Sequence, residues 1–158
     1  SLFAFIPMLR LLEGQFHFGG WAVPAGAVWL LVVILLCAIT DISAYFAGRQ
    51  FGRRALAPAI SPKKTVEGSL VGVLSAGSFL AALAPYLGLQ PSLAFGFGCL
   101  VSVHGQVGDL WESALKREME AKDSGDLISG HGGVLDRFDS LAFAAPAFFL
   151  GGRFLGWF

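Results

Sequence analysis

The stretch WAVPAGAVWLLVVILLCAIT, residues 21–40, contains twenty residues and no charged side chain. About 20 apolar residues in a helix are enough to cross the hydrocarbon core of a bilayer. Three further runs have a similar length and composition, at residues 69–89, 91–108 and 141–158. The pattern predicts an all-α integral membrane protein, a polytopic bundle of about four full transmembrane helices joined by two polar loops.

The overall composition supports this class. The chain of 158 residues is 55% hydrophobic and 14% charged, whereas soluble domains are about 45–50% apolar and about 25% charged. The opening segment SLFAFIPML, residues 1–9, is short and has no basic flank. We interpret it as a partial N-terminal helix and not as a signal peptide. Residues 1–158 are therefore expected to form one membrane domain, the C-terminal part of a longer chain.

The basic residues predict an orientation. Nine of the eleven lie in the two polar segments that separate the first run from the second and the third from the fourth. These nine are Arg49, Arg53, Arg54, Lys63, Lys64, Lys116, Arg117, Lys122 and Arg137. The other two, Arg10 and Arg153, fall on the opposite side. Because cytoplasmic loops carry the excess of Lys and Arg, both polar segments are predicted to face the cytoplasm.

A polar stripe follows the third apolar run. Asp109, Glu112, Ser113 and Lys116 are spaced i, i+3, i+4 and i+7, which places them on one face of a helix. An ionisable side chain inside a span costs about 2.5–3.5 kcal/mol on insertion scales and needs a partner or a function. The alternative is that the span ends near Gly108 and is followed by an ordinary solvated helix.

Other polar residues near the runs have simpler interpretations. Asp41 and Tyr45 fit the interfacial end of a helix, with Asp41 a structural or supporting residue. His104 fits a hydrogen-bonded packing role. In GHGGVLDRFDS, residues 130–140, carboxylates 136 and 139 suit the start of the last helix. Helix capping explains one of the two carboxylates, but it does not explain the arginine between them or the glycines before them. The backbone N–H groups of these glycines can wrap an anion, or the glycines can form a flexible turn.

The two cation-rich segments lie on the same predicted side as these carboxylates. Mg²⁺ prefers oxygen ligands and commonly takes one or two carboxylates plus substrate phosphates, and Lys and Arg neutralise the remaining phosphate charge. The arrangement therefore fits a site for a metal and phosphates. The alternative is a polybasic loop that sets topology or binds anionic lipid head groups.

Residues 113–140 closely resemble the signature of the phosphatidate cytidylyltransferases, or CDP-diacylglycerol synthases. That signature runs S-x-x-K-R, four residues, K-D, a short spacer, H-G-G, two residues and D-R-x-D. It maps onto Ser113, Lys116, Arg117, Lys122, Asp123, His131, Gly132, Gly133, Asp136, Arg137 and Asp139. Residues 41–54 and 61–69 are similar to the same family. Ser129 departs from the pattern, because the family has Pro or Gly two residues before the histidine.

The resemblance implies an integral membrane nucleotidyltransferase and makes the chain a single catalytic domain. Its substrates would be CTP and phosphatidic acid, its products CDP-diacylglycerol and pyrophosphate, and its cofactor Mg²⁺, with a second metal or a monovalent ion left open. The compact loops indicate a bacterial inner membrane protein, and the distribution of basic residues predicts an active site that faces the cytoplasm. Membrane lipids are expected partners, nucleic acid is not, and a homodimer stays open.

The resemblance also implies roles for particular residues. Asp109 and Asp136 are expected to be metal ligands, with Asp139 a third ligand or the residue that orients Lys116 or Arg137. Cations expected to hold the triphosphate are Lys116, Arg117, Lys122 and Arg137. Further residues expected to bind substrate are Lys63, Lys64, Thr65, Ser113, Asp123, His131, Gly132 and Gly133.

Three other functions remain as alternatives. A CTP-dependent kinase of a polyprenol or phytol needs the same carboxylates and cations but releases CDP in place of pyrophosphate. A transporter would place ionisable groups at mid-depth and often contains repeats, whereas this chain shows no internal repeat and its charges gather on one side. A purely structural membrane module would not need so many charges there.

Overall fold

The computed structural model describes residues 4–118 and 135–158 of the chain. Within these ranges the fold is a bundle of four long helices, with one short helix, two β-hairpins and a 3-10 turn. The helices are α1 (Phe5–Arg10), α2 (Ala25–Phe51), α3 (Val66–Leu83), η2 (Ala84–Leu87), α4 (Pro91–Glu118) and α5 (Leu135–Phe154). The strands are β1 (Gln15–Phe18), β2 (Trp21–Pro24), β3 (Ala55–Ala57) and β4 (Ser61–Thr65).

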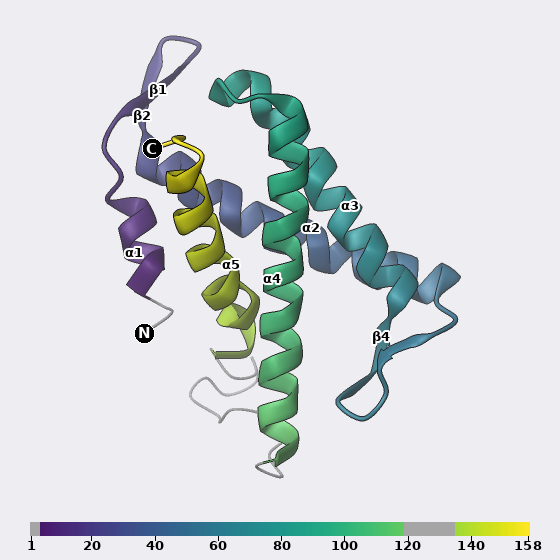
Figure 1. The fold of residues 1–158 in the computed structure, drawn as a ribbon. Helices are drawn as coiled ribbons and strands as arrows, with labels where there is room; N and C mark the ends of the chain where they lie inside the picture. Colours follow the sequence, from purple (N-terminus) through teal and green to yellow (C-terminus); the bar gives the residue numbers. More distant parts are fainter. Residues whose placement is uncertain (1–3, 119–134) are drawn as a thin grey trace.

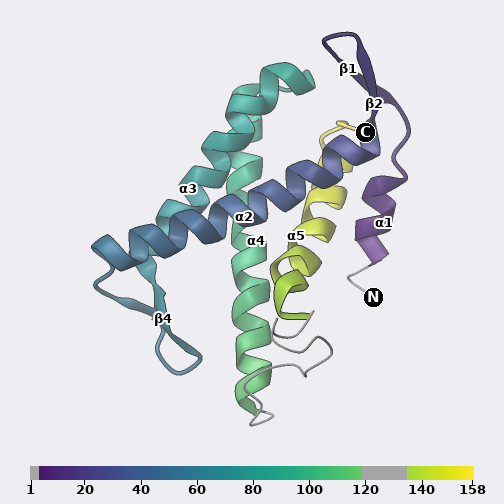
Figure 2. The same ribbon diagram turned by 180° about the vertical axis from the view of Figure 1, so that it is seen from behind.

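Helix α4 is the central element of the bundle. It lies between α3 and α5, and α2 crosses behind all three (Figure 1). The reverse view shows α2 in front, with the β3–β4 hairpin at one end and the β1–β2 hairpin at the other (Figure 2). Long helices that follow one another in the sequence also pack against one another: α2 against α3, α3 against α4, and α4 against α5.

Most residues of each of the four apolar runs lie in a helix. Among the described residues, two helical segments are long and apolar enough to cross a membrane, Ala25–Phe51 and Val66–Leu87. A shorter apolar segment runs over Ser140–Phe154. Many large apolar side chains on the outer faces are exposed, among them Leu31 and Leu70, which suits contact with lipid. The predicted class of a mainly helical membrane protein is therefore supported.

The structure differs from the predicted all-α chain in its two β-hairpins. Residues 21–24, expected as the first turn of a span, instead pair with residues 15–18 in an antiparallel ladder. Gly19 and Gly20 form the two-residue turn with φ of 54° and 88°, which only glycine adopts readily. The helix starts after Pro24, whose backbone is extended. The hairpin thus replaces one helical turn.

Two of the long helices, α2 and α4, continue past the ends of their apolar runs. Helix α2 continues eleven residues past Thr40 to Phe51, and α4 continues ten residues past Gly108 to Glu118. The polar residues that follow these two runs are therefore helical, as the spacing from Asp109 to Lys116 predicted.

The packed core lies toward the end of the bundle that holds the β1–β2 hairpin. Trp29 is 2% exposed, and its ring contacts those of Phe16, Phe148 and Phe158. Aromatic contacts of this kind add about 0.5–1.5 kcal/mol each beyond the buried area. Much of the aromatic core therefore gathers around Trp29 at this end.

Small residues close the seam between α2 and α3. Thr40, Ala44 and Gly48 on α2 face Gly68 and Gly72 on α3, both sets at four-residue spacing. A Cβ at position 68 would lie 2.5 Å from the Ala44 carbonyl oxygen. Small residues at this spacing let membrane helices approach closely. The start of α3, and the hairpin before it, are thereby held against α2.

Candidate functional site

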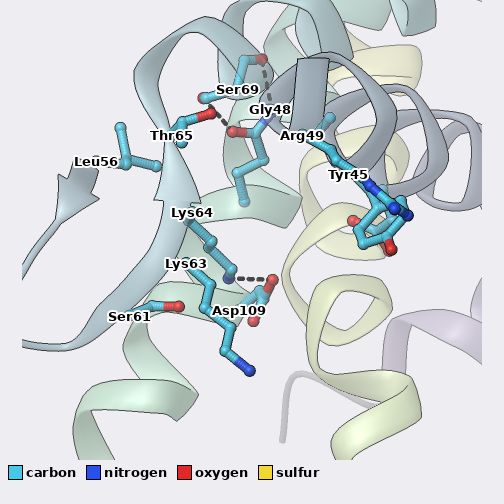
Figure 3. A pocket seen from close by; sticks show the side chains of 13 residues that line it. Tyr45, Gly48, Arg49, Leu56, Ser61, Lys63, Lys64, Thr65, Ser69 and Asp109 are labelled. Atoms are coloured by element: carbon cyan, nitrogen blue, oxygen red, sulfur yellow. Dashed lines mark hydrogen bonds and ion pairs between the residues drawn. The ribbon is translucent and has the colours of Figure 1, made fainter. Parts of the chain in front are cut away.

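A cavity of about 620 Å³ lies at the end of α2 that carries the β3–β4 hairpin (Figure 3). Four elements contribute to its wall: α2, the hairpin, the first turn of α3 and the middle of α4. Its lining residues are Asp41, Ala44, Tyr45, Gly48, Arg49, Leu56, Ser61, Lys63, Lys64, Thr65, Ser69, Gln106 and Asp109. Three cationic and two acidic side chains in one wall make this a polar cavity in an otherwise apolar chain.

The hairpin is anchored to the start of α3 by local hydrogen bonds. The Glu67 carboxylate accepts from the backbone N–H groups of Arg53, at 3.1 Å, and Arg54, at 3.3 Å. The Thr65 hydroxyl accepts from the N–H of Gly68 at 3.2 Å and so caps α3. These contacts fix the strand that carries both cavity lysines.

An ion pair joins the hairpin to α4. The ammonium group of Lys64 contacts the Asp109 carboxylate, and their side chains are 30% and 29% exposed. The ammonium nitrogen itself is buried. Lys63 lines the same wall and is exposed. Phosphate entering the cavity would meet two ammonium groups beside one carboxylate (Figure 3).

A second polar contact joins α3 to α4 in the same wall. The Ser69 hydroxyl donates to the side-chain oxygen of Gln106, and the Gln106 amide nitrogen donates back to the Ser69 carbonyl at 3.2 Å. Gln106 lies one helical turn before Asp109.

The rest of the predicted stripe lies further along α4. Lys116 pairs with Glu112 at 3.0 Å, and Glu112 is 8% exposed. The Arg117 guanidinium donates to the Ile60 carbonyl at the hairpin tip, at 3.4 Å. None of these three, nor Ser113, lines the cavity. Lys116 shares the helical face of Asp109, two turns beyond it.

Helix α5 returns antiparallel beside α4 (Figures 1 and 2). The backbone of Gly105 on α4 lies beside that of Ser140 on α5. Position 109 is one turn beyond Gly105, and position 136 is one turn before Ser140. The backbone therefore brings positions 109 and 136 to the same level of the helix pair, and positions 136, 137 and 139 all fall in the first two turns of α5.

The structure brings together four of the predicted site residues: Lys63, Lys64, Thr65 and Asp109 all line the cavity. Five others lie outside the described residues. These are Lys122, Asp123, His131, Gly132 and Gly133.

Several cavity residues were not predicted as site residues. Asp41, interpreted from the sequence as an interfacial or supporting residue, lies inside α2 and lines the cavity with Tyr45 and Arg49. Their spacing of four residues was a usable signal, because it puts them on one helical face. Ser69 and Gln106 gave no such signal, since they lie 37 residues apart.

The donor atoms of the cavity suit a metal ion that binds together with phosphate. Among residues 4–118 and 135–158, no group of three or more His, Cys, Asp or Glu side chains is placed to hold a metal. Asp41 and Asp109 nevertheless line one wall. Because Mg²⁺ commonly takes one or two carboxylates and completes its shell with phosphate and water, two carboxylates beside lysines fit it.

The fold and the site define the class of protein as a helical bundle with membrane-length apolar segments and a polar cavity lined by lysines and carboxylates. The chain belongs to the cytidylyltransferase family, whose model matches residues 1–155. The resemblance found in residues 113–140 is thereby confirmed.

Individual relatives are similar over most of this chain. The phosphatidate cytidylyltransferase of Aquifex aeolicus (strain VF5) is 45% identical over 122 residues, which cover 77% of this chain and 46% of that protein. The phosphatidate cytidylyltransferase of Helicobacter pylori (strain ATCC 700392 / 26695) is 42% identical over 148 residues, covering 90% and 53%. The uncharacterized protein YnbB of Escherichia coli (strain K12) is 42% identical over 131 residues, covering 80% and 43%. The chain thus spans about half the length of these relatives.

Proposed function

We propose that this chain carries the catalytic site of a phosphatidate cytidylyltransferase, which converts CTP and phosphatidic acid into CDP-diacylglycerol and pyrophosphate. Family membership and the names of the relatives support the reaction. The observation that carries the proposal is the cavity in which Lys64 contacts Asp109 and which Lys63 also lines. Such a cavity can hold anionic phosphates next to a carboxylate.

The chemistry needs positioning more than it needs a protein nucleophile. An oxygen of the lipid phosphate attacks the α-phosphorus of CTP, the bond from that phosphorus to the bridging oxygen breaks, and pyrophosphate leaves. The phosphate of one substrate is bound by Lys63, Lys64 and Thr65, which line the cavity. Fixed cations near the transferring group stabilise its charge in the transition state.

The remaining roles in this proposal follow the family signature. Asp109 and Asp136 hold Mg²⁺, which when bound neutralises phosphate charge, and the location of positions 109 and 136 at one level of the α4/α5 pair supports this assignment. Asp139 is a third ligand or orients Lys116 or Arg137, and a second metal or a monovalent ion remains open. Cations for the triphosphate are Lys116, Arg117, Lys122 and Arg137. Further substrate contacts are Ser113, Asp123, His131, Gly132 and Gly133.

In the proposed membrane arrangement, four segments cross the bilayer. These are α2, α3 with η2, α4 and α5. The protein lies in the inner membrane of a bacterium, and its cavity faces the cytoplasm. This orientation follows from the positive-inside rule, because nine of the eleven basic residues lie on that side. The bundle is surrounded by lipid, which supplies phosphatidic acid directly. Association into a homodimer is compatible with this arrangement.

The test is release of pyrophosphate by the full-length protein in detergent micelles that contain phosphatidic acid, with CTP and Mg²⁺ added. We expect release that requires all three. The Asp136→Asn variant keeps the side-chain volume and removes the charge, so we expect a folded, inserted protein without turnover. Glu118→Gln is the matched control, because this exposed carboxylate at the end of α4 does not line the cavity.

Two results would contradict parts of the proposal. Release of CDP upon addition of a polyprenol, with no pyrophosphate, would assign the chain to the lipid kinases. An active Asp136→Asn variant would show that the metal assignment is wrong while leaving the reaction in place.

A further inference from the structure

The Ser69–Gln106 pair is a two-point contact between α3 and α4. One hydrogen bond runs from the Ser69 hydroxyl to the Gln106 side-chain oxygen, and the other from the Gln106 amide to the Ser69 backbone carbonyl. The side-chain amide of Gln106 therefore uses both its acceptor and its donor on one residue. Two bonds to one residue fix orientation as well as distance.

This contact joins α4, which carries Asp109, to the first turn of α3, the helix that directly follows the strand of Lys64. Strand β4, which contains Lys64, ends at Thr65, and α3 begins at the next residue. Ser69 therefore lies in the first turn of the helix that directly follows this strand. Gln106 lies three residues before Asp109 on α4. Both members of the contact line the cavity.

The helices do not depend on this pair to pack. Farther from the cavity, α3 and α4 meet through small residues, and a Cβ at Gly98 would lie 2.9 Å from the Ala76 carbonyl. A separate polar contact, Thr40 to Ser102 at 2.8 Å, joins α2 to α4. Thr40 and Ser102 do not line the main cavity. The Ser69–Gln106 contact is distinguished by its location beside the ion pair.

We propose that Ser69 and Gln106 are positioning residues, which hold Lys64 and Asp109 at the spacing that the substrate phosphates require. The inference rests on the proposed function for its catalytic consequence. Its geometric content, that the pair controls the Lys64–Asp109 contact, can be tested without substrate.

The geometric test measures the reactivity of lysine amines in the full-length protein in detergent. The Lys64 ammonium nitrogen is buried against Asp109, whereas Lys63 is exposed on the same strand, so an amine-directed reagent followed by mass spectrometry should modify Lys64 more slowly. We expect Gln106→Ala and Ser69→Ala to raise the Lys64 rate severalfold relative to Lys63. Ser69→Thr keeps the hydroxyl and should retain the protection, and Ser102→Ala removes a different interhelical bond and should leave it unchanged.

The kinetic test measures pyrophosphate release by the same variants. We expect Gln106→Ala to lower kcat/KM by about tenfold or more, because a misplacement of ~1 Å can cost about 100-fold, and to raise the KM of at least one substrate. A smaller folded fraction would lower kcat alone. The double variant should be no worse than Gln106→Ala, since the two residues act as one contact.

The outcomes separate the two proposals. Unchanged Lys64 reactivity in Gln106→Ala would overturn the positioning role whether or not the wild type releases pyrophosphate. If the wild type is active, an unchanged KM for both substrates would overturn it as well. A wild-type protein that releases no pyrophosphate, but whose Lys64 protection depends on the pair, would overturn the proposed function and support the contact.

Discussion

Asp109 is the residue for which we expect the largest difference between the effect of a substitution on activity and its effect on folding. Its carboxylate contacts the Lys64 ammonium and lines the cavity, and its side chain is 29% exposed. Partly exposed ion pairs contribute about 0–1 kcal/mol to stability. We therefore expect Asp109→Asn to change the free energy of unfolding little while lowering pyrophosphate release at least about 100-fold, as loss of one preorganised charge does.

The measurement combines turnover with thermal unfolding of the variant in detergent. Glu118→Gln serves again as the matched control, because it removes a carboxylate from the same helix outside the cavity. Turnover within a few-fold of wild type in Asp109→Asn would contradict the role of this carboxylate.

At this scale the sequence predicts residue types better than contacts. The KKT segment and Asp109 were expected to be site residues from the family resemblance, and they do line one cavity. The Lys64–Asp109 pair itself could not be predicted, because it joins residues 45 positions apart through the crossing of α3 and α4. The bond from Arg117 to the Ile60 carbonyl could not be predicted either, because no pattern in the sequence indicates that the tip of a hairpin reaches α4.

One carboxylate, that of Glu67, joins the chain before the β3–β4 hairpin to the first turn of α3. The Glu67 carboxylate accepts hydrogen bonds from the backbone N–H groups of Arg53 and Arg54, and a charged acceptor forms stronger hydrogen bonds than a neutral one. We expect Glu67→Ala to raise the amide hydrogen-exchange rates of Arg53 and Arg54 about tenfold or more. Glu67→Gln retains an acceptor oxygen and should have the smaller effect. Equal rates in wild type and Glu67→Ala would show that the hairpin is held by other contacts.

The seam between α2 and α3 gives a sharp prediction about packing. A Cβ added at Gly68 would lie 2.5 Å from the Ala44 carbonyl oxygen, whereas one added at Gly96 would meet nothing within 4 Å. Gly68→Ala should destabilise the protein by about 1–3 kcal/mol through overpacking. Gly96→Ala, in the interior of α4, should stabilise it by about 0.5–1 kcal/mol. Melting temperatures in detergent test both, and a loss of stability in both variants would contradict the assigned seam.

The lengths of the elements show where sequence reasoning works and where it stops. Apolar runs predicted where the four long helices lie, because hydrophobic length is set by the bilayer. They did not predict that α2 continues past Asp41 to Phe51, since hydropathy falls while helical hydrogen bonding continues. They also missed the strands, which are held by the Gly19–Gly20 turn and by anchors such as Glu67 and not by apolar content.

The molecule as a whole is polarised along α2. The aromatic core around Trp29 and the β1–β2 hairpin lie at one end, and the cavity with the β3–β4 hairpin lies at the other (Figure 2). If α2 crosses the membrane, as its length and composition allow, the two hairpins must emerge on opposite sides. From the distribution of basic residues we predict that the cavity end faces the cytoplasm.

This orientation predicts the sidedness of labelling in intact cells. We expect His17→Cys, exposed on β1, to react with a membrane-impermeant thiol reagent added outside spheroplasts. Ala59→Cys, exposed between β3 and β4, should react only after lysis, because the bilayer excludes the reagent from the cytoplasmic side. Both variants are made with the native cysteines, Cys37 and Cys99 among them, replaced by alanine. Labelling of both positions from outside would contradict the spanning role of α2, and the reverse sidedness would place the cavity on the wrong side for cytoplasmic CTP.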